Sequence, residues 1–131
     1  SDLRKGKDIS LENGSIISNN EVTIEASKPN SYAYCSDTRF CNNVISKIKN
    51  VTVLYHEATF SKNHKEIAKK TGHSTTFDAA KIAKRSKVKM LIIGHYSKRY
   101  SDLNELLIEC KSIFENSFLA KEGGVIDFNT I

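Results

Sequence analysis

The sequence of 131 residues predicts an α/β fold, in which strands and helices alternate along the chain and pack as layers. Short apolar runs indicate strands at 32–35, 51–55 and 88–93, and the last two are rich in β-branched residues. Segments with helical spacing of apolar residues follow these strands, most clearly from Leu103 to Phe114. No glycine-rich phosphate loop follows any of the strands, which argues against a nucleotide-binding domain.

The two ends of the chain predict smaller elements. Residues 9–17 indicate a hairpin that turns at Asn13-Gly14, a pair that favours tight turns. Residues 22–26 alternate and predict an edge strand, so 1–30 is expected to be a hairpin and an edge strand leading into a single unit, 1–131. The tail from 118 to 128 predicts two short strands around Gly123-Gly124.

The predicted helices have recognisable ends. They are expected at 40–48, at 63–70, after Thr75 as far as Arg85, and from Leu103 to Phe114. Gly72 is a typical residue at a helix C-terminus. The pairs Thr75 with Asp78 and Asp102 with Glu105 have the spacing of N-terminal capping boxes.

The composition indicates a globular protein without a membrane segment. Apolar residues make up 39% and charged residues 27%, and no apolar run is long enough to span a bilayer. The first residues carry no signal-peptide core, so the chain is expected to be cytoplasmic or to start internally. The three cysteines, Cys35, Cys41 and Cys110, form no metal-binding pattern and predict free thiols in a reducing compartment.

The positive charge is unevenly distributed. The net charge is +5, but eleven Lys or Arg residues lie between Lys62 and Arg99, opposed only by Glu66 and Asp78. A local basic field favours polyanions such as nucleic acid. A solvated lysine-rich surface on two helices explains the same residues, and charge alone does not decide between the two interpretations.

Polar residues follow the predicted strands at their carboxyl ends, where ligands bind in open α/β sheets. Asp37 follows the strand at 32–35, and His95 follows the strand at 88–93. Carboxylate and imidazole are standard zinc ligands, although a catalytic zinc ion usually has three protein ligands. A turn-forming aspartate and a half-buried histidine remain the alternative.

Glu57 and His73 form a second candidate pair. A glutamate beside an imidazole orients the ring and raises its basicity, which suits acid–base catalysis, and a purely structural hydrogen bond is the alternative. His56-Glu57 begins like the HExxH motif of zincins, but Phe60 stands where the second histidine should be. His64 lies in a basic polar run and is expected to be exposed to solvent.

The segment after His95 offers donors for a phosphate group. Ser97, Lys98 and Arg99 could bind an anion together. The alternative is a loop whose Tyr100 packs against the next helix.

Together these segments resemble ribonuclease Z (tRNase Z), a family within the metallo-β-lactamase superfamily. CSDT at 35–38 resembles the aspartate motif of the family, HEATF at 56–60 and HST at 73–75 resemble two motifs particular to it, and GHYSKRY at 94–100 resembles its final histidine motif. The similarity runs from about Tyr32 to the C-terminus and is weaker in the preceding hairpin. The aspartate and histidine motifs occur across the superfamily, whereas HEAT with HST narrows the match.

The resemblance implies a zinc-dependent endoribonuclease that trims the 3′ end of precursor tRNA after the discriminator nucleotide, commonly as a homodimer. It implies the following roles: Asp37 bridges two zinc ions, His95 binds one of them, Glu57 and His73 assist proton transfer to the leaving 3′ oxygen, and Ser97, Lys98 and Arg99 contact RNA phosphate. RNA backbones favour cationic surfaces, which agrees with the basic stretch.

The sequence departs from the family in one large respect. The main zinc motif, His-x-His-x-Asp-His, is absent, as is the family's tRNA-gripping arm. The fold implied is therefore the C-terminal half of an αββα sandwich, with one mixed sheet, helices on one side and the other sheet face exposed. A truncated piece, inactive alone and weak in zinc binding, is expected. The alternatives are a non-catalytic RNA-binding module and a superfamily hydrolase of small phosphodiesters.

Overall fold

The computed structural model describes residues 2–131 and contains a four-stranded parallel sheet as its centre. The strands, in spatial and sequence order, are β3 (Tyr32–Cys35), β4 (Val53–Glu57), β5 (Met90–Gly94) and β6 (Ser117–Leu119). All three pairings are parallel, so the predicted α/β class is confirmed but the expectation of a mixed sheet is wrong for this sheet. The reason is that each connection includes a helix, which returns the chain to the same end of the sheet.

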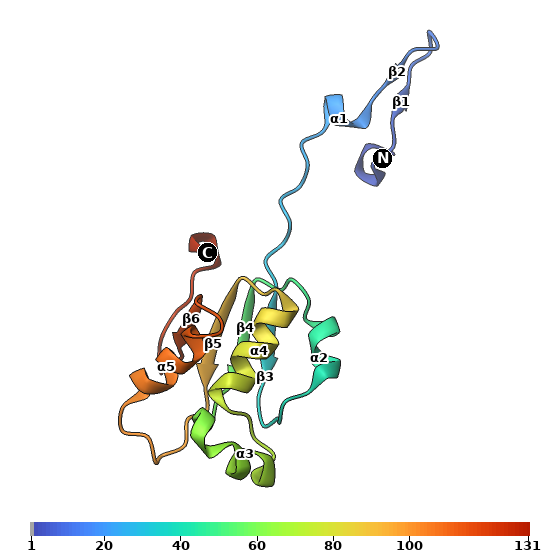
Figure 1. The fold of residues 1–131 in the computed structure, drawn as a ribbon. Coiled ribbons are helices and arrows are strands. Elements are labelled where there is room, and N and C mark those ends of the chain that lie inside the picture. The colour runs from blue at the N-terminus through green and yellow to red at the C-terminus, as the bar shows by residue number, and fades with distance from the viewer. Residues whose placement is uncertain (1) are drawn as a thin grey trace.

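Helices cover one side of this sheet (Figure 1). They are α2 (Asn42–Lys47), α4 (Thr76–Ser86) and α5 (Leu103–Lys111), while α3 (Lys65–Thr71) lies near the carboxyl ends of the strands. Gly72 ends α3 with φ of +77°, and Thr75 with Asp78 forms the predicted capping box of α4. Asp102 caps α5 by accepting a hydrogen bond from the backbone N–H of Asn104, rather than through the predicted partner Glu105.

The N-terminal segment leads away from the sheet (Figure 1). After a 3₁₀ turn (Asp2–Lys5), β1 (Ile9–Ser10) pairs antiparallel with β2 (Ile16–Ile17) as the predicted hairpin, with Gly14 at φ of +82°. The edge strand expected at 22–26 is not formed. Instead α1 (Asn19–Val22) is followed by residues 23–31 without regular structure, because β-forming residues need a partner strand to become a strand.

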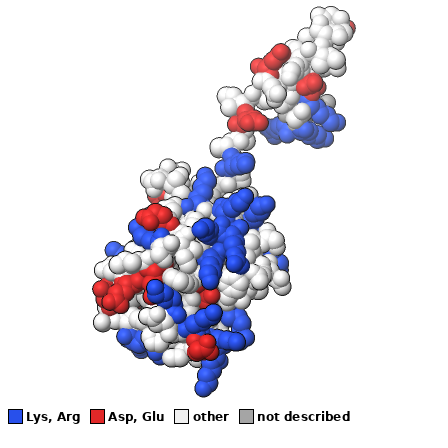
Figure 2. All heavy atoms as spheres, in the orientation of Figure 1, with Lys and Arg blue, Asp and Glu red and all other residues white. Residues whose placement is uncertain are grey.

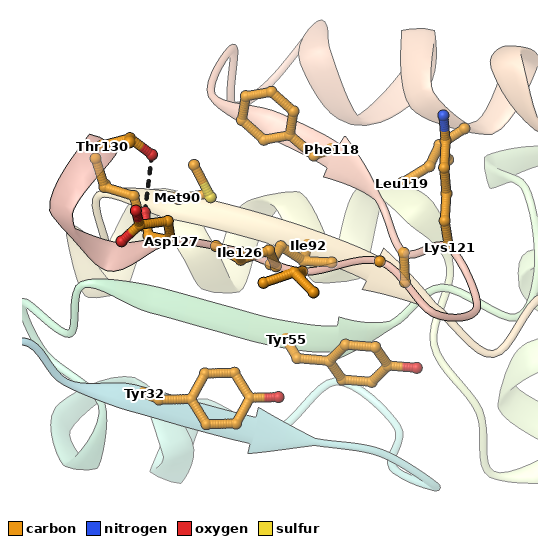
Figure 3. A pocket seen from close by; sticks show the side chains of 14 residues that line it. Tyr32, Tyr55, Met90, Ile92, Phe118, Leu119, Lys121, Ile126, Asp127 and Thr130 are labelled. Atoms are coloured by element: carbon orange, nitrogen blue, oxygen red, sulfur yellow. Dashed lines mark hydrogen bonds between the residues drawn. The ribbon is translucent and has the colours of Figure 1, made fainter.

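The C-terminal tail also differs from expectation. Of the two strands predicted between 118 and 128, only β6 is formed, and the chain ends with a 3₁₀ turn (Phe128–Thr130). The tail passes over the sheet face that carries no helix and leaves a hollow of about 450 Å³ there (Figure 3). Tyr32, Ile92 and Phe118 are among the residues that line it.

The hydrophobic core lies between the sheet and the helices. Leu54, Leu91 and Ile93 point from the sheet into this layer and are fully buried. Alanines on α4, with Ile82, allow that helix to pack closely on the strands. The opposite sheet face is apolar and only partly covered: Val53 and Ile92 are buried, whereas Tyr32 and Tyr34 are 55% and 64% exposed.

Two further sequence-based expectations concern the whole chain. The three cysteines are free, and Cys110 is buried while Cys35 and Cys41 are half-buried. Within the described part of the chain, each helix falls short of the length and apolar character needed to cross a bilayer.

Candidate metal centre and acid–base pair

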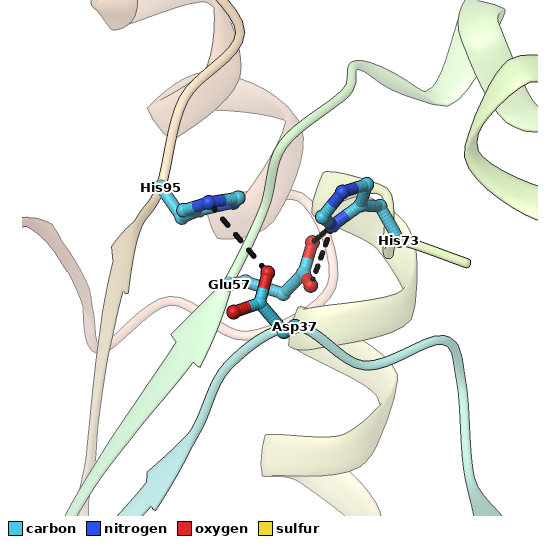
Figure 4. A group of neighbouring side chains, drawn as sticks. All are labelled: Asp37, Glu57, His73 and His95. Atoms are coloured by element: carbon cyan, nitrogen blue, oxygen red, sulfur yellow. Dashed lines mark hydrogen bonds and ion pairs between the residues drawn. The ribbon is translucent and has the colours of Figure 1, made fainter. Parts of the chain in front are cut away.

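Four polar side chains meet at the carboxyl edge of the sheet (Figure 4). Asp37 follows β3, Glu57 ends β4, His95 follows β5, and His73 precedes α4. One ligand atom from each lies within 4.8 Å of the others. Parallel strands bring their carboxyl ends to the same edge, which explains how residues up to 58 positions apart along the chain become neighbours.

The backbone is unusual at two of these residues. Asp37 and His95 have φ of +48° and +60°, in the left-handed region that side chains other than glycine rarely adopt. Such conformations concentrate at functional sites, where neighbouring structure holds them. Gly94 is required beside His95, because a Cβ atom there would collide with the ring of Tyr55.

Glu57 is the buried anchor of the site, with a side chain that has no exposed surface. Its carboxylate accepts hydrogen bonds from the backbone N–H of Thr38 at 2.7 Å, the backbone N–H of Ser74 at 3.0 Å, the hydroxyl of Thr59 at 2.6 Å, and Nδ1 of His73 at 2.9 Å. Burial alone raises the pKa of Glu57, but the bonds from Ser74, Thr59, His73 and Thr38 outweigh it and lower the pKa. Glu57 is therefore ionised, and its lone pairs are engaged by donors rather than left for a metal ion.

His73 is oriented by this carboxylate. Its Nδ1–H donates to both Glu57 oxygens, at 2.9 and 3.1 Å, and its side chain is 23% exposed. The remaining ring nitrogen, Nε2, accepts a proton when the ring is neutral and donates one when the ring is protonated. The contact that both interpretations require is present, and the pair has the arrangement of a general acid–base group. Whether the pair is catalytic or purely structural stays a prediction.

Asp37 and His95 have the donor chemistry for a metal ion. His95 Nε2 lies 3.8 Å from Asp37 Oδ1, which is too long for a hydrogen bond and near the ~3.4 Å expected between two ligands of one tetrahedral zinc ion. Among residues 4–131, no hydrogen-bond donor reaches the Asp37 carboxylate, whose side chain is 80% exposed. The two residues fit a zinc ion but supply fewer than the three ligands of a catalytic site.

The other two histidines have structural surroundings. His56 is 2% exposed, donates from Nδ1 to the carbonyl of Glu57 at 2.7 Å, and has its pKa lowered by burial. His64 is half-buried, so the expectation that it is exposed to solvent is wrong. The cause is Tyr100, whose hydroxyl donates to His64 Nδ1 at 2.6 Å and accepts from the Ser61 N–H at 2.8 Å.

The segment 97–99 lies directly after His95 and is only partly free. Ser97 is held by a hydrogen bond from its N–H to the carbonyl of Thr59 at 3.0 Å. Its hydroxyl accepts from Arg99 Nε at 3.3 Å, and the guanidinium of Arg99 lies 5.3 Å from the centre of the Phe60 ring. Lys98 is exposed. Contact of these three residues with phosphate stays a prediction.

Comparison with solved structures defines the class of protein. A metallo-β-lactamase fold protein from Bacillus subtilis aligns with a TM-score of 0.67 at 24% identity, covering 72% of this chain and 38% of that one. A long form RNase Z from yeast aligns with a TM-score of 0.59 at 27% identity, covering 75% of this chain and 13% of that one. Human tRNase Z, short form, aligns with a TM-score of 0.53 at 29% identity, over 66% and 28%. The chain has the α/β architecture of part of a metallo-β-lactamase fold.

Comparison with curated sequences is more specific. Ribonuclease Z of Phocaeicola vulgatus is 43% identical over 129 residues, which cover 98% of this chain and 42% of that protein. Ribonuclease Z of Porphyromonas gingivalis (strain W83) is 45% identical over 123 residues, covering 94% and 40%. No family model matches the chain. The chain is a homologue of part of ribonuclease Z, and it spans about two fifths of the length of these relatives.

Proposed function

We propose that this chain contributes part of the active site of a zinc-dependent endoribonuclease that cleaves precursor tRNA after the discriminator nucleotide. The observation that carries the proposal is the meeting of Asp37, Glu57, His73 and His95 at one sheet edge in a homologue of ribonuclease Z. The Glu57–His73 pair favours this reaction class over simple metal storage, because a carboxylate-anchored imidazole is suited to moving protons.

In this proposal Asp37 and His95 hold zinc, and zinc, when bound, makes water acidic enough to act as a nucleophile near neutral pH. The bond between phosphorus and the leaving 3′ oxygen breaks as the new P–O bond forms. Protonated His73 gives its Nε2 proton to that oxygen, while Nδ1–H stays bonded to Glu57 at 2.9 Å. The carboxylate of Glu57 keeps the ring oriented before and after the transfer.

The remaining ligands of a two-zinc site would come from a segment that carries His-x-His-x-Asp-His, a pattern this sequence does not contain. The 80% exposure of Asp37 leaves room for such ligands to approach. The open apolar face of the sheet, with Tyr34 and Phe118 exposed, would pack against the layer that carries them.

The surface charge suits a precursor tRNA. Figure 2 shows Lys and Arg side chains gathered over the helix-covered side, where Lys81, Lys84 and Arg85 of α4 are exposed. Among residues 4–131, Lys111 with Glu115 is the only ion pair between a Lys or Arg side chain and a carboxylate. Most of the positive charge is thus available to RNA phosphate, and Lys98 and Arg99 would contact phosphate next to His95. Cytoplasmic location and a homodimer belong to the same proposal, and free cysteines agree with a reducing compartment.

The decisive experiment is zinc-dependent cleavage of a precursor tRNA by this chain alone and after mixing with a chain that supplies the His-x-His-x-Asp-His half. We expect activity only in the mixture, and its loss in Asp37→Asn and His95→Ala. Glu122→Gln, which removes an exposed tail carboxylate, is the matched control and should leave cleavage unchanged. RNA binding without cleavage in an assembled mixture would contradict the proposal and favour a non-catalytic RNA-binding module.

A second substrate tests the role given to His73. Bis(p-nitrophenyl) phosphate has a leaving group that departs without a proton, so His73→Asn should slow its cleavage little. The same variant should slow cleavage of precursor tRNA by about 10²–10⁴-fold, the usual contribution of a general acid. Equal losses on both substrates would contradict proton donation by His73, and efficient cleavage of the small substrate alone would indicate a hydrolase of small phosphodiesters.

A further inference from the structure

Thr59 links the Glu57–His73 pair to the Asp37–His95 pair. Its hydroxyl lies 2.6 Å from Glu57 Oε2 and 2.8 Å from His95 Nδ1. Thr59 itself is only 7% exposed. Glu57 and His95 are not hydrogen-bonded to each other, so the Thr59 hydroxyl is the link between the buried carboxylate and the exposed imidazole.

The direction of these two hydrogen bonds follows from counting protons. A hydroxyl has one hydrogen, and the ionised carboxylate of Glu57 only accepts, so the Thr59 hydrogen lies toward Glu57. The reverse arrangement would place two oxygen lone pairs against each other at 2.6 Å. The Thr59 oxygen therefore accepts from His95, which puts the ring proton of His95 on Nδ1.

The consequence appears on the other side of the ring. In the neutral ring, a proton on Nδ1 leaves the lone pair on Nε2, which lies 3.8 Å from Asp37 Oδ1. Two electron-pair donors facing each other without a proton between them favour a cation at that position. The tautomer set by Thr59 is thus the one that a metal ion requires.

The backbone holds Thr59 against the His95 loop. The N–H of Ala58 donates to the carbonyl of Gly94 at 2.8 Å, and the N–H of Ser97 donates to the carbonyl of Thr59 at 3.0 Å. These bonds lie on both sides of His95, whose own backbone is in the left-handed region. A side chain that is 44% exposed on such a backbone needs an anchor to keep one orientation, and Thr59 provides it.

We propose that Thr59 is a positioning residue through which Glu57 fixes the tautomer and orientation of His95, so that one buried carboxylate orients both histidines of the site. His73 is held directly and His95 through the hydroxyl. The importance of this link for zinc binding rests on the proposed function, whereas its effect on the His95 tautomer does not.

The first test is ¹⁵N NMR of the metal-free chain with labelled histidine, recorded well above the ordinary histidine pKa of about 6.5 so that the rings are neutral. Native chain and Thr59→Ser should show His95 protonated on Nδ1. Thr59→Val, which keeps the side-chain shape and removes the hydroxyl, should lose this preference. His73 should stay protonated on Nδ1 in all three, and this serves as the internal control for a folded site.

Two results would overturn the proposal: His95 protonated on Nε2 in the native chain, or a His95 tautomer that Thr59→Val leaves unchanged. If His73 also changes in Thr59→Val, the hydroxyl supports the whole site and a specific link to His95 is contradicted.

The second test uses zinc itself, in the mixture that completes the ligand set. Zinc affinity should fall about 10–100-fold in Thr59→Val, the usual effect of removing the partner of a ligand histidine, and should recover in Thr59→Ser. A tautomer change without any change in zinc affinity would contradict the metal role of His95 in the proposed function while leaving the positioning role of Thr59 established.

Discussion

The two faces of the parallel sheet are built from the same strands but have opposite surroundings. On the helix-covered face, Leu54 and Leu91 are completely buried. On the other face, Tyr34 is 64% exposed although it stacks on Tyr55 at a centroid distance of 4.7 Å. Because successive side chains of a strand point to opposite faces, each strand contributes to both surfaces, and the difference arises from what covers them.

The contrast suggests that the two faces have different roles, one in folding stability and the other in association with further protein. The covered face holds a core that three helices close, and most of the buried apolar side chains belong to it. The open face carries large aromatic side chains that parallel sheets normally bury on both sides. We infer that the covered face determines whether the chain folds and the open face determines what it joins.

The largest effect is expected from opening a cavity on the covered face. Leu91→Ala should lower the free energy of unfolding by about 2–5 kcal/mol, since a fully buried leucine loses both transfer energy and packing. Tyr34→Ala, on the open face, should cost about 0.5–1.5 kcal/mol through loss of its stacking on Tyr55. Urea unfolding followed by circular dichroism measures both, and equal losses would show that the two faces contribute alike to stability.

A second effect concerns His56, a titratable side chain on the covered face. Burial lowers its pKa, so the folded chain resists protonation while the unfolded chain accepts a proton below about 6.5. Stability from this group is therefore present above pH 6.5 and is lost as the pH falls toward the folded pKa, by at most about 1.4 kcal/mol per pH unit. His56→Asn keeps a donor for the Glu57 carbonyl and should flatten this slope.

The dependence of stability on pH also separates the contribution of His56 from that of Glu57. The pKa of Glu57 is lowered from 4.5, so its stabilising contribution is present above that pH and is lost only as the pH falls below it. His56→Asn should leave the loss below pH 4.5 in place. If the slope between pH 6.5 and 4.5 is the same in both proteins, the interpretation of His56 as a neutral core histidine is wrong.

Much of this arrangement was predictable from the sequence, because the signals are local. Apolar runs predicted the three main strands, and the Thr75–Asp78 pair predicted the start of α4. The positions of Asp37 and His95 directly after strands indicated a common sheet edge, since parallel strands end together.

The errors come from interactions that spacing does not specify. Residues 22–26 have strand-like alternation but lack a partner strand. His64 lies in a polar run, yet Tyr100 from a distant loop covers it. The link through Thr59 depends on two loops meeting in space, and the only sequence signal for it was its place in the HEAT segment.

The next prediction concerns the reactivity of Cys110, a buried thiol on the covered face. Burial raises the pKa of Cys110 to about 12, and its thiol lies 3.3 Å from the carbonyl of Thr76. At pH 8 only about one thiol in ten thousand would then be ionised, so Cys110 should not react with Ellman's reagent in the folded chain. A Cys35→Ser, Cys41→Ser double variant should react only after urea is added. Rapid reaction of this variant without urea would show that the covered face opens readily.

The smallest change in stability is expected on the open face, where the effect on association is the more informative one. Tyr32 is 55% exposed and borders the hollow beneath the C-terminal tail, so Tyr32→Ser should alter the free energy of unfolding by no more than about 0.5 kcal/mol. It should nevertheless weaken self-association at high protein concentration and assembly with the complementary half, both measured by sedimentation velocity. Ser46→Ala, at an exposed position of α2, is the control on the helix-covered side. If Tyr32→Ser leaves both kinds of association unchanged, the open face is not the assembly surface, and the tail alone is enough to cover it.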